Sequence, residues 1–332
     1  MSVWPWEPGS ATGIGSLPGT DIAEATKLVL GEFPALPHLP ELPARGPGAD
    51  LIGRGAGFLV GIPVELYSGQ WRVASSPGRD LRRTRDLLER DLDVLTKAAN
   101  GYRGPLKVQA PGPWTLAASL ELPVGGRLLH DHGAVQDLAA SLAEGLAAHV
   151  TDVARRVPGA SVLLQVDEPS VPAVLAGRVP TESGLRTLRS VAASTVESAL
   201  RNLINAAGVP VIVHCCAEQP PLRLFRDAGA SAVAVDIAMI DSATAAQDEL
   251  GELIDGGVGL LAGAVPTTGT TPPLSTHAAD AVTSLWRRLG FPPERAAAQV
   301  VVTPTCGLAG ATPDYARAAL AACTEAGRRL EV

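Results

Sequence analysis

The chain has 332 residues and is 46% hydrophobic, so it is long and apolar enough to bury a large core. Its 27 basic and 34 acidic residues give a net charge of −7, which argues against a nucleic-acid partner or an anionic membrane surface. No apolar run approaches the ~20 residues that cross a bilayer and the N-terminal residues do not resemble a signal peptide, so we expect a cytoplasmic protein without a disulfide framework.

Short apolar runs rich in β-branched residues recur along the chain and predict strands. Nearly continuous apolar strands indicate burial on both faces, as in a parallel sheet. In chain order, the eight predicted strands are Ala11–Leu17, Phe58–Val64, Leu106–Ala110, Ser161–Val166, Val209–Val213, Ser231–Val235, Val258–Val265 and Gln299–Thr303.

Longer amphipathic stretches lie between these runs and predict helices. The clearest are Asp80–Asn100, Ala134–Arg156, Glu182–Ala207, Leu274–Leu289 and Pro313–Arg328. Strands that alternate with helices form right-handed βαβ units, and eight such units close into a barrel. We therefore predict an α/β fold, with a single (β/α)8 TIM barrel over residues 1–332.

One segment interrupts this alternation. Residues 32–57 are rich in proline and glycine and connect the first two predicted strands. A linker of that length in a compact barrel is typical of a functional loop or lid, and an ordered surface excursion fits the composition equally well.

Functional residues of such a barrel lie at the carboxyl ends of its strands. The fifth predicted strand runs directly into His214, Cys215 and Cys216. Because side chains two residues apart on extended backbone point the same way, His214 and Cys216 can meet one metal ion while Cys215 points elsewhere. Taken alone, the segment fits buried cysteines at a strand end better than a metal site.

Cys306 follows the last predicted strand, and Asp236 follows the sixth. Side chains at the rim of a barrel can lean over its axis, so these two can join His214 and Cys216 there. One imidazole, two thiolates and a carboxylate suit a tetrahedral zinc ion with bonds of roughly 2.0–2.3 Å. Thiolates favour zinc over Mg²⁺ or Ca²⁺. Cys323 lies in the last predicted helix, and we expect it in the core.

Such a site suits thiol chemistry better than hydrolysis, because two thiolates and a carboxylate leave it negatively charged. Zinc stabilises a bound thiolate, which stays nucleophilic at neutral pH, and a methyl group is a suitable electrophile. An amino-acid thiol also needs partners for its ammonium and carboxylate groups. Asp167, Glu65 and the Ile14–Gly15–Ser16 turn lie at strand ends and can supply them, although each alone is typical of a solvated acid or a helix cap.

Five ordered motifs resemble one known family. IGSLP lies near the start, VQAPGPWTL and QVDEP lie at the third and fourth predicted strands, HCC follows the fifth, and PTCGL lies near the end. In this order and spacing, from about Thr12 to about Arg328, they resemble the C-terminal catalytic barrel of cobalamin-independent methionine synthase, especially its short archaeal-type relatives. The resemblance implies zinc-dependent methyl transfer to the thiol of homocysteine, which forms methionine.

The resemblance also implies residue roles. The family's zinc ligands are His, Cys, Glu and Cys; His214, Cys216 and Cys306 match three of them, and Asp236 stands at the glutamate position. Because aspartate is shorter by one methylene, its bond to zinc would be longer, water-bridged or absent. The family's homocysteine-binding positions correspond here to Ile14, Gly15, Ser16, Glu65 and Asp167.

Three departures from the family concern the methyl donor. The sequence has no counterpart of the N-terminal half that helps the long enzymes to hold their folate donor. Leu116–Leu120 lacks the tryptophan that stacks on the pterin in those enzymes, and Ala264 stands where they carry a histidine associated with proton delivery. Because a cobalt leaving group needs no proton, we expect a methylated corrinoid, free or carried by a partner protein, as the donor.

Three other functions fit parts of the sequence. The same zinc–thiol chemistry can serve another thiol acceptor, as in the related coenzyme M alkyltransferases. Asp236 and Ala264 also fit a non-catalytic barrel that binds zinc or a thiol. A uroporphyrinogen decarboxylase relative shares the barrel type but needs no metal, so the His/Cys set argues against it.

Overall fold

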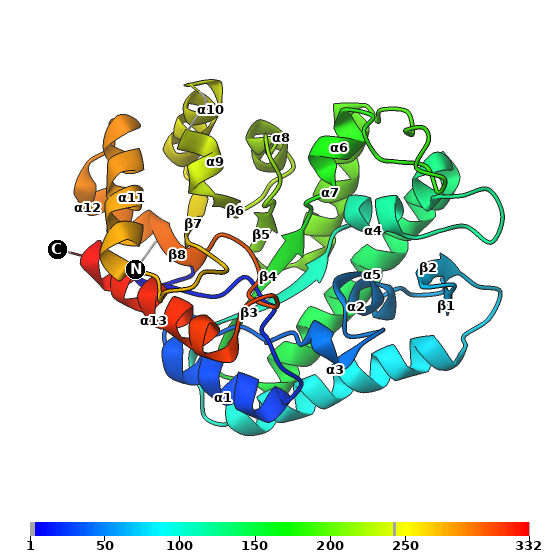
Figure 1. The fold of residues 1–332 in the computed structure, drawn as a ribbon, viewed down its shortest axis with the longest axis horizontal. Helices are drawn as coiled ribbons and strands as arrows, with labels where there is room; N and C mark the ends of the chain where they lie inside the picture. Colours follow the sequence, from blue (N-terminus) through cyan, green and yellow to red (C-terminus); the bar gives the residue numbers. More distant parts are fainter. Residues whose placement is uncertain (1–3, 242–243, 332) are drawn as a thin grey trace.

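A computed structural model describes residues 4–241 and 244–331. Its centre is a six-stranded parallel sheet whose strand order follows the chain order. The sheet curls, and helices cover its outer face (Figure 1). The strands are β3 (Gly104–Pro111), β4 (Ala160–Asp167), β5 (Val211–His214), β6 (Ala232–Asp236), β7 (Gly259–Val265) and β8 (Val300–Pro304).

Six of the eight predicted strands, the third to the eighth, are confirmed. They are mostly apolar because both faces of the sheet are buried, and the buried polar exceptions on β3 and β4 include Lys107, Gln109 and Gln165. Leu163, Ile212 and Leu261 form an inner cluster with Ile14 and Trp6, while other strand residues pack under the outer helices. The uniform hydrophobicity read from the sequence therefore reflects a parallel sheet buried on both sides.

The first two predicted strands are wrong, and the described residues do not form a full eight-stranded barrel. Phe58–Val64 follows helix α2 (Leu51–Gly57) and leads into a separate hairpin. This hairpin pairs β1 (Val64–Tyr67) with β2 (Gln70–Val73) in antiparallel fashion. Ala11–Leu17 contains isolated bridges where a strand was expected.

Two extended segments nevertheless connect the edges of the sheet. The N-terminal one lies beside β8, where the amide of Thr12 donates to the carbonyl of Val302 at 3.1 Å. The other, residues 37–41, pairs with β3. The two segments join where the amide of Leu17 donates to the carbonyl of Glu41 at 2.9 Å. Single bridges thus take the place of two strands, and the second segment belongs to the proline-rich excursion.

Most predicted helices are confirmed near their expected bounds, as α3 (Arg79–Ala98), α5 (His132–Arg156), α11 (Ser275–Arg288) and α13 (Pro313–Arg329). Helix α7 (Ala193–Ala207) begins later than predicted, because residues 181–190 form a loop. The other α-helices are α1 (Ile22–Glu32), α4 (Pro113–Ser119), α6 (Val171–Leu175), α8 (Leu222–Asp227), α9 (Ile237–Asp241), α10 (Thr244–Asp255) and α12 (Pro293–Gln299).

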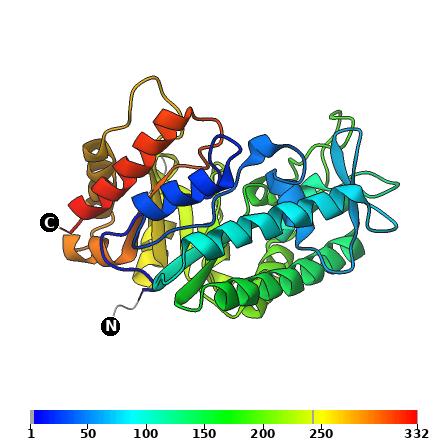
Figure 2. The same ribbon diagram turned by 90° about the horizontal axis from the view of Figure 1, so that it is seen from below.

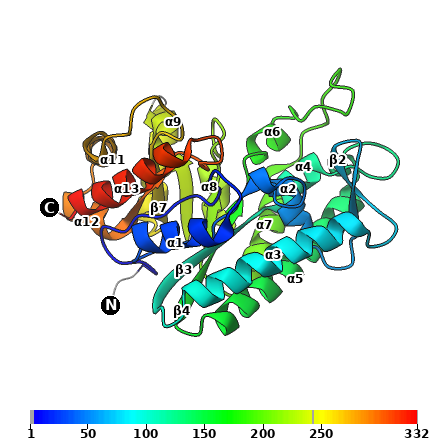
Figure 3. The ribbon, with the colours of Figure 1, turned by 60° about the horizontal axis from the view of Figure 1, so that its bottom comes forward.

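The two long helices α3 and α5 run side by side (Figure 2, Figure 3). Arg156 of α5 forms ion pairs with Glu89 and Asp93 of α3. The buried leucines of α3 recur at helical spacing, as the sequence predicted, and are Leu81, Leu88, Leu92 and Leu95. Within the described ranges, no helix has the length and apolarity needed to cross a membrane.

Candidate metal centre

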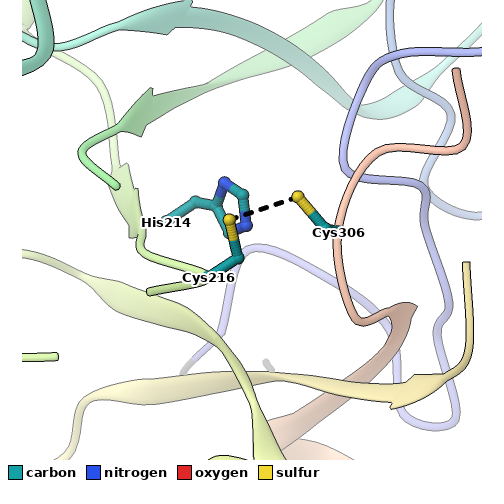
Figure 4. A group of neighbouring side chains, drawn as sticks. All are labelled: His214, Cys216 and Cys306. Carbon is teal, nitrogen blue, oxygen red and sulfur yellow. Dashed lines mark hydrogen bonds between the residues drawn. The ribbon is translucent and has the colours of Figure 1, made fainter. Parts of the chain in front are cut away.

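Three side chains of metal-ligating type meet at the carboxyl end of the sheet. His214 is the last residue of β5, Cys216 lies two residues beyond it, and Cys306 lies two residues beyond β8. Their ligand atoms all lie within 4.8 Å of one another, and the two sulfurs are 3.2 Å apart. The three side chains point toward one another (Figure 4). The fold therefore brings together three of the four residues that the sequence proposed as metal ligands.

One carboxylate orients the buried imidazole of His214. The register of β4 and β5 places Asp167 opposite His214, and Oδ1 of Asp167 lies 2.8 Å from Nδ1 of the ring. Within the described ranges, Nε2 is buried and has no hydrogen-bond partner. Because the carboxylate accepts a proton held on Nδ1, Nε2 is the ring nitrogen that faces the two sulfurs, where a metal ion can replace its proton. A buried nitrogen of this kind is the group that a bound metal ion would satisfy.

The two thiols differ in their tendency to ionise. The hydrogen bond shared with Cys216 and the neighbouring His214 lower the pKa of Cys306 to about 4, although burial opposes them. The same hydrogen bond, followed by burial, raises the pKa of Cys216. Burial lowers the pKa of His214, but Asp167 and Cys306 outweigh it and raise that pKa to about 9. The protein groups alone therefore favour a thiolate on Cys306, the form in which sulfur binds metals.

This donor set fits a zinc ion. Imidazole nitrogen and thiolate sulfur are the ligands that zinc prefers in proteins, and oxygen-seeking Mg²⁺ and Ca²⁺ do not favour them. Catalytic zinc sites keep three protein ligands and leave a further position open to water or substrate. His214, Cys216 and Cys306 supply three such ligands.

The structure does not bring Asp236 into this group. Asp236 ends β6, and its Oδ1 accepts a hydrogen bond from the amide of Ala238 at 3.0 Å, at the start of α9. It lines a separate cavity of about 460 Å³ together with Ala264 and Thr305. Burial raises the pKa of Asp236, and the charge of Cys306 adds to this effect. Asp236 therefore caps a helix beside the cluster.

A cavity of about 220 Å³ opens next to the three ligands. Asp167 and the predicted Ile14–Gly15–Ser16 turn also line it. Four further lining residues come from the proline-rich excursion, namely Glu41, Pro43, Ala49 and Leu51. The excursion is thus a wall of the pocket, which favours the functional interpretation of this segment over a surface excursion.

The turn at Ile14–Ser16 is held from two sides. The carbonyl of Ile14 accepts hydrogen bonds from Nζ of Lys107 and Nε2 of Gln165, both at 2.9 Å. On the other side, a Cβ atom added at Gly307 would lie 2.0 Å from Oγ of Ser16. The turn therefore packs directly against the residue that follows Cys306.

Glu41 is a pocket residue that the sequence analysis missed. Its buried carboxylate accepts a hydrogen bond from Nε of Arg54 at 3.2 Å. Arg54 also donates to Asp91, which forms a second, bidentate pair with Arg45. Burial raises the pKa of Glu41, although Arg54 opposes the shift. The available signal was one acid between prolines and leucines, in the stretch HLPELP.

Glu65, which the sequence placed in the substrate pocket, lies elsewhere. It belongs to β1 and forms an ion pair with Arg72 of β2 at 2.6 Å, with 39% of its side chain exposed. The assignment was wrong because the apolar run before Glu65 is not a strand of the curled sheet. Cys323 packs in the core, as expected, and Cys215, which was expected to point away from the metal ligands, also packs in the core.

Comparison with known proteins gives one family match. The model of the family described as cobalamin-independent synthase, catalytic domain, matches residues 101–329. No curated protein matches the chain. The solved B12-independent methionine synthase from Shewanella sp. W3-18-1, in complex with selenomethionine, is similar with a TM-score of 0.60 at 14% identity, over 97% of each chain.

A protein from Pseudomonas aeruginosa, provisionally described as a dihydrodipicolinate synthetase, has a TM-score of 0.39 at 12% identity, over 97% of this chain and 74% of its own. That similarity is too low to carry an argument, whereas the Shewanella structure shows the fold. The family and the Shewanella enzyme are both described as independent of cobalamin. Neither therefore supports the corrinoid donor expected from the sequence.

Proposed function

The chain belongs to the family of cobalamin-independent synthase catalytic domains, a family of methyltransferases, and we propose that it transfers a methyl group to the thiol of homocysteine to form methionine. The observation that carries this proposal is Nε2 of His214, which has no hydrogen-bond partner among the described residues and lies beside two sulfurs at the wall of a small pocket. A thiol substrate in that pocket would lie next to the metal-binding groups.

We propose that His214, Cys216 and Cys306 hold a zinc ion, with a position left open for the acceptor sulfur. A bound zinc ion would lower the pKa of the acceptor thiol and keep its thiolate nucleophilic at neutral pH. Asp167 holds the imidazole in the tautomer that presents Nε2. The S–CH₃ bond then forms as the bond between the methyl group and its donor breaks, and the donor leaves with the bonding electrons.

The charge of the pocket supports an amino-acid acceptor. Two carboxylates, Asp167 and Glu41, line a cavity of about 220 Å³ and suit the ammonium group of homocysteine. Glu41 takes the role that was predicted for Glu65. The Ser16 hydroxyl and the backbone amides of its turn can receive the substrate carboxylate. Two acids in so small a space would repel a sulfonate thiol such as coenzyme M, which disfavours that alternative acceptor.

The donor side carries the weaker argument. A corrinoid donor rests on the missing aromatic residue in Leu116–Leu120 and on Ala264, while the family is described as independent of cobalamin. We therefore confine the proposal to the acceptor and the metal. Assays with methyltetrahydropteroyl-triglutamate and with methylcobalamin, each as sole donor, decide which donor type the chain uses.

The test is zinc content together with methionine formation. Purified wild-type protein should hold about one zinc per chain, and Cys306→Ser should lose both the zinc and turnover. Cys215→Ala is the matched control, because Cys215 adjoins a ligand in sequence but lies in the core. It should keep its zinc. Wild-type protein without zinc under metal-replete conditions, or without methionine from either donor, would contradict the proposal.

A further inference from the structure

A lysine lies inside the curled sheet, at the back of the proposed site. Lys107 is on β3 and is fully buried. Its Nζ donates to the carbonyl of Ile14 at 2.9 Å, to Oε1 of Gln165 at 2.7 Å and to Oε1 of Gln109 at 3.3 Å. All three donors of the ammonium group therefore have protein acceptors, one of which belongs to the turn that lines the pocket.

Gln165 continues the chain of hydrogen bonds toward the metal cluster. Gln165 and Asp167 lie two residues apart on β4, so both side chains point to the inside of the sheet. Its Nε2 donates to the carbonyl of Ile14 at 2.9 Å and to Oδ1 of Asp167 at 2.7 Å. The same Oδ1 lies 2.8 Å from Nδ1 of His214. The carbonyl of Ile14 therefore contacts both Lys107 and Gln165, and Oδ1 of Asp167 contacts both Gln165 and His214.

We propose that Lys107 and Gln165 are positioning residues that join the acceptor-binding turn at Ile14 and the metal-binding His214 into one hydrogen-bonded unit. Occupation of the pocket and binding of the metal then favour each other, because both require the same alignment of Gln165. This inference rests on the proposed function for the identity of the acceptor. The predicted effect of Gln165 on metal affinity does not depend on the proposed function.

The energetics of the lysine support a functional role. Burying an ammonium group costs several kcal/mol unless charges and hydrogen bonds compensate it. Burial lowers the pKa of Lys107 to about 7, and the opposing charges are those of Asp167 and Glu41. These two acids line the pocket. The lysine is therefore stabilised by the groups that it would help to position, and an apolar residue could fill the interior at lower cost.

Coupling of this kind predicts reciprocal effects on two binding reactions. An acceptor analogue without sulfur lacks the group through which homocysteine would bind the metal, so its effect on metal affinity reports coupling through the protein once its own chelation of free zinc has been subtracted. 2-Aminobutyrate is homocysteine without its thiol group. In the wild type, saturating 2-aminobutyrate should raise zinc affinity by roughly fivefold or more, the range of ordinary coupling between two sites.

The experiment measures zinc affinity by competition with a chromophoric chelator, with and without 2-aminobutyrate. Gln165→Leu should lower zinc affinity by roughly tenfold and abolish the response to 2-aminobutyrate. Lys107→Met should weaken the same response, with a rise in the KM for homocysteine. The matched control is Gln299→Leu, which removes a buried glutamine that donates to the carbonyls of Ile254 and Val258. Gln299→Leu should change neither the zinc affinity nor its response to 2-aminobutyrate.

Each outcome separates the coupling from the proposed function. A wild type whose zinc affinity ignores 2-aminobutyrate, or a folded Gln165→Leu variant with unchanged zinc affinity, overturns the coupling even if methionine is formed. Methionine formation without coupling therefore supports the proposed function and refutes the coupling. If Lys107→Met does not fold, the comparison of Gln165→Leu with Gln299→Leu decides the question, with thermal unfolding as the check that both variants are native.

Discussion

The charge of Asp167 strengthens its hydrogen bond to His214, so removing that charge should weaken metal binding. In Asp167→Asn, an amide oxygen can still accept from Gln165 and from Nδ1 of the imidazole, but the negative charge is lost. A hydrogen bond to a charged group contributes ~1.5–3 kcal/mol, and a neutral one ~0.5–1.5 kcal/mol. The difference of ~1–1.5 kcal/mol corresponds to roughly a tenfold weaker zinc complex.

Asp236→Asn is the matched control for this prediction. It also removes one negative charge near Cys306, but its amide oxygen can keep the hydrogen bond to the amide of Ala238. Because Asp236 lies outside the group of ligand atoms, its zinc affinity should stay close to that of the wild type. The assay is chelator competition on both variants, with thermal unfolding to confirm that they are native.

The ranking of the two variants tests the reasoning. A loss of affinity that is larger in Asp236→Asn than in Asp167→Asn would make Asp236 a direct ligand, as the sequence suggested. The arrangement with three protein ligands and one open position would then be refuted. Equal and small losses in both variants would instead show that His214 does not depend on its carboxylate partner.

Three further predictions test packing, pocket size and charge. A Cβ added at Gly145 would lie 1.8 Å from the carbonyl oxygen of Phe58, so Gly145→Ala should lower the free energy of unfolding by ~1–3 kcal/mol in urea titration. Gly251 in helix α10 is the control, because a Cβ there would lie 3.9 Å from its nearest neighbour, so Gly251→Ala should not lower this free energy. Ala49→Leu fills part of the cavity of about 220 Å³ and should raise the KM for homocysteine while zinc affinity stays unchanged. A drop in zinc affinity would show that this wall of the pocket is not independent of the metal ligands. Burial holds the pKa of Lys107 at about 7, below its ordinary value of 10.5, so between these pH values the unfolded chain binds one more proton than the folded protein. The free energy of unfolding should therefore rise with pH by about 1.4 kcal/mol per pH unit in this range. A Lys107→Met variant should lack this slope, and identical slopes in the two proteins would disprove the burial of a titrating ammonium group.

Burial on both faces decided which parts of the fold could be predicted. Most strands of the sheet carry apolar residues on both faces, so their runs stand out from the helices between them. Residues 37–41 also pair with the sheet, but through isolated bridges inside a proline-rich stretch, where no run of strand formers marks them. Phe58–Val64 carries the expected pattern for another reason, since Phe58 and Leu59 are buried in the loop after α2 and Val64 is buried at the start of β1.

The same rule separates the site residues that could be found from those that could not. His214, Cys216 and Cys306 follow strands that were located correctly, so their convergence could be predicted from chain order alone. Glu65 was chosen because it follows a supposed strand, and it lies on a hairpin instead. Glu41 was missed because nothing local to HLPELP shows that an arginine from α2 would hold its carboxylate beside the pocket.

The candidate site therefore has two parts with different origins. The metal-binding part is fixed by sheet register, since pairing of β4 with β5 sets Asp167 opposite His214 whatever the loops do. The acceptor wall comes from the excursion, whose Glu41 depends on the buried ion pairs of Arg54 with Glu41 and Asp91. Substitutions in residues 41–51 can thus alter the acceptor without disturbing the metal ligands, whereas a change at Asp167, which lines the pocket and orients His214, affects both. This division accounts for a sequence resemblance that is clearest in motifs at strand ends and absent from the excursion.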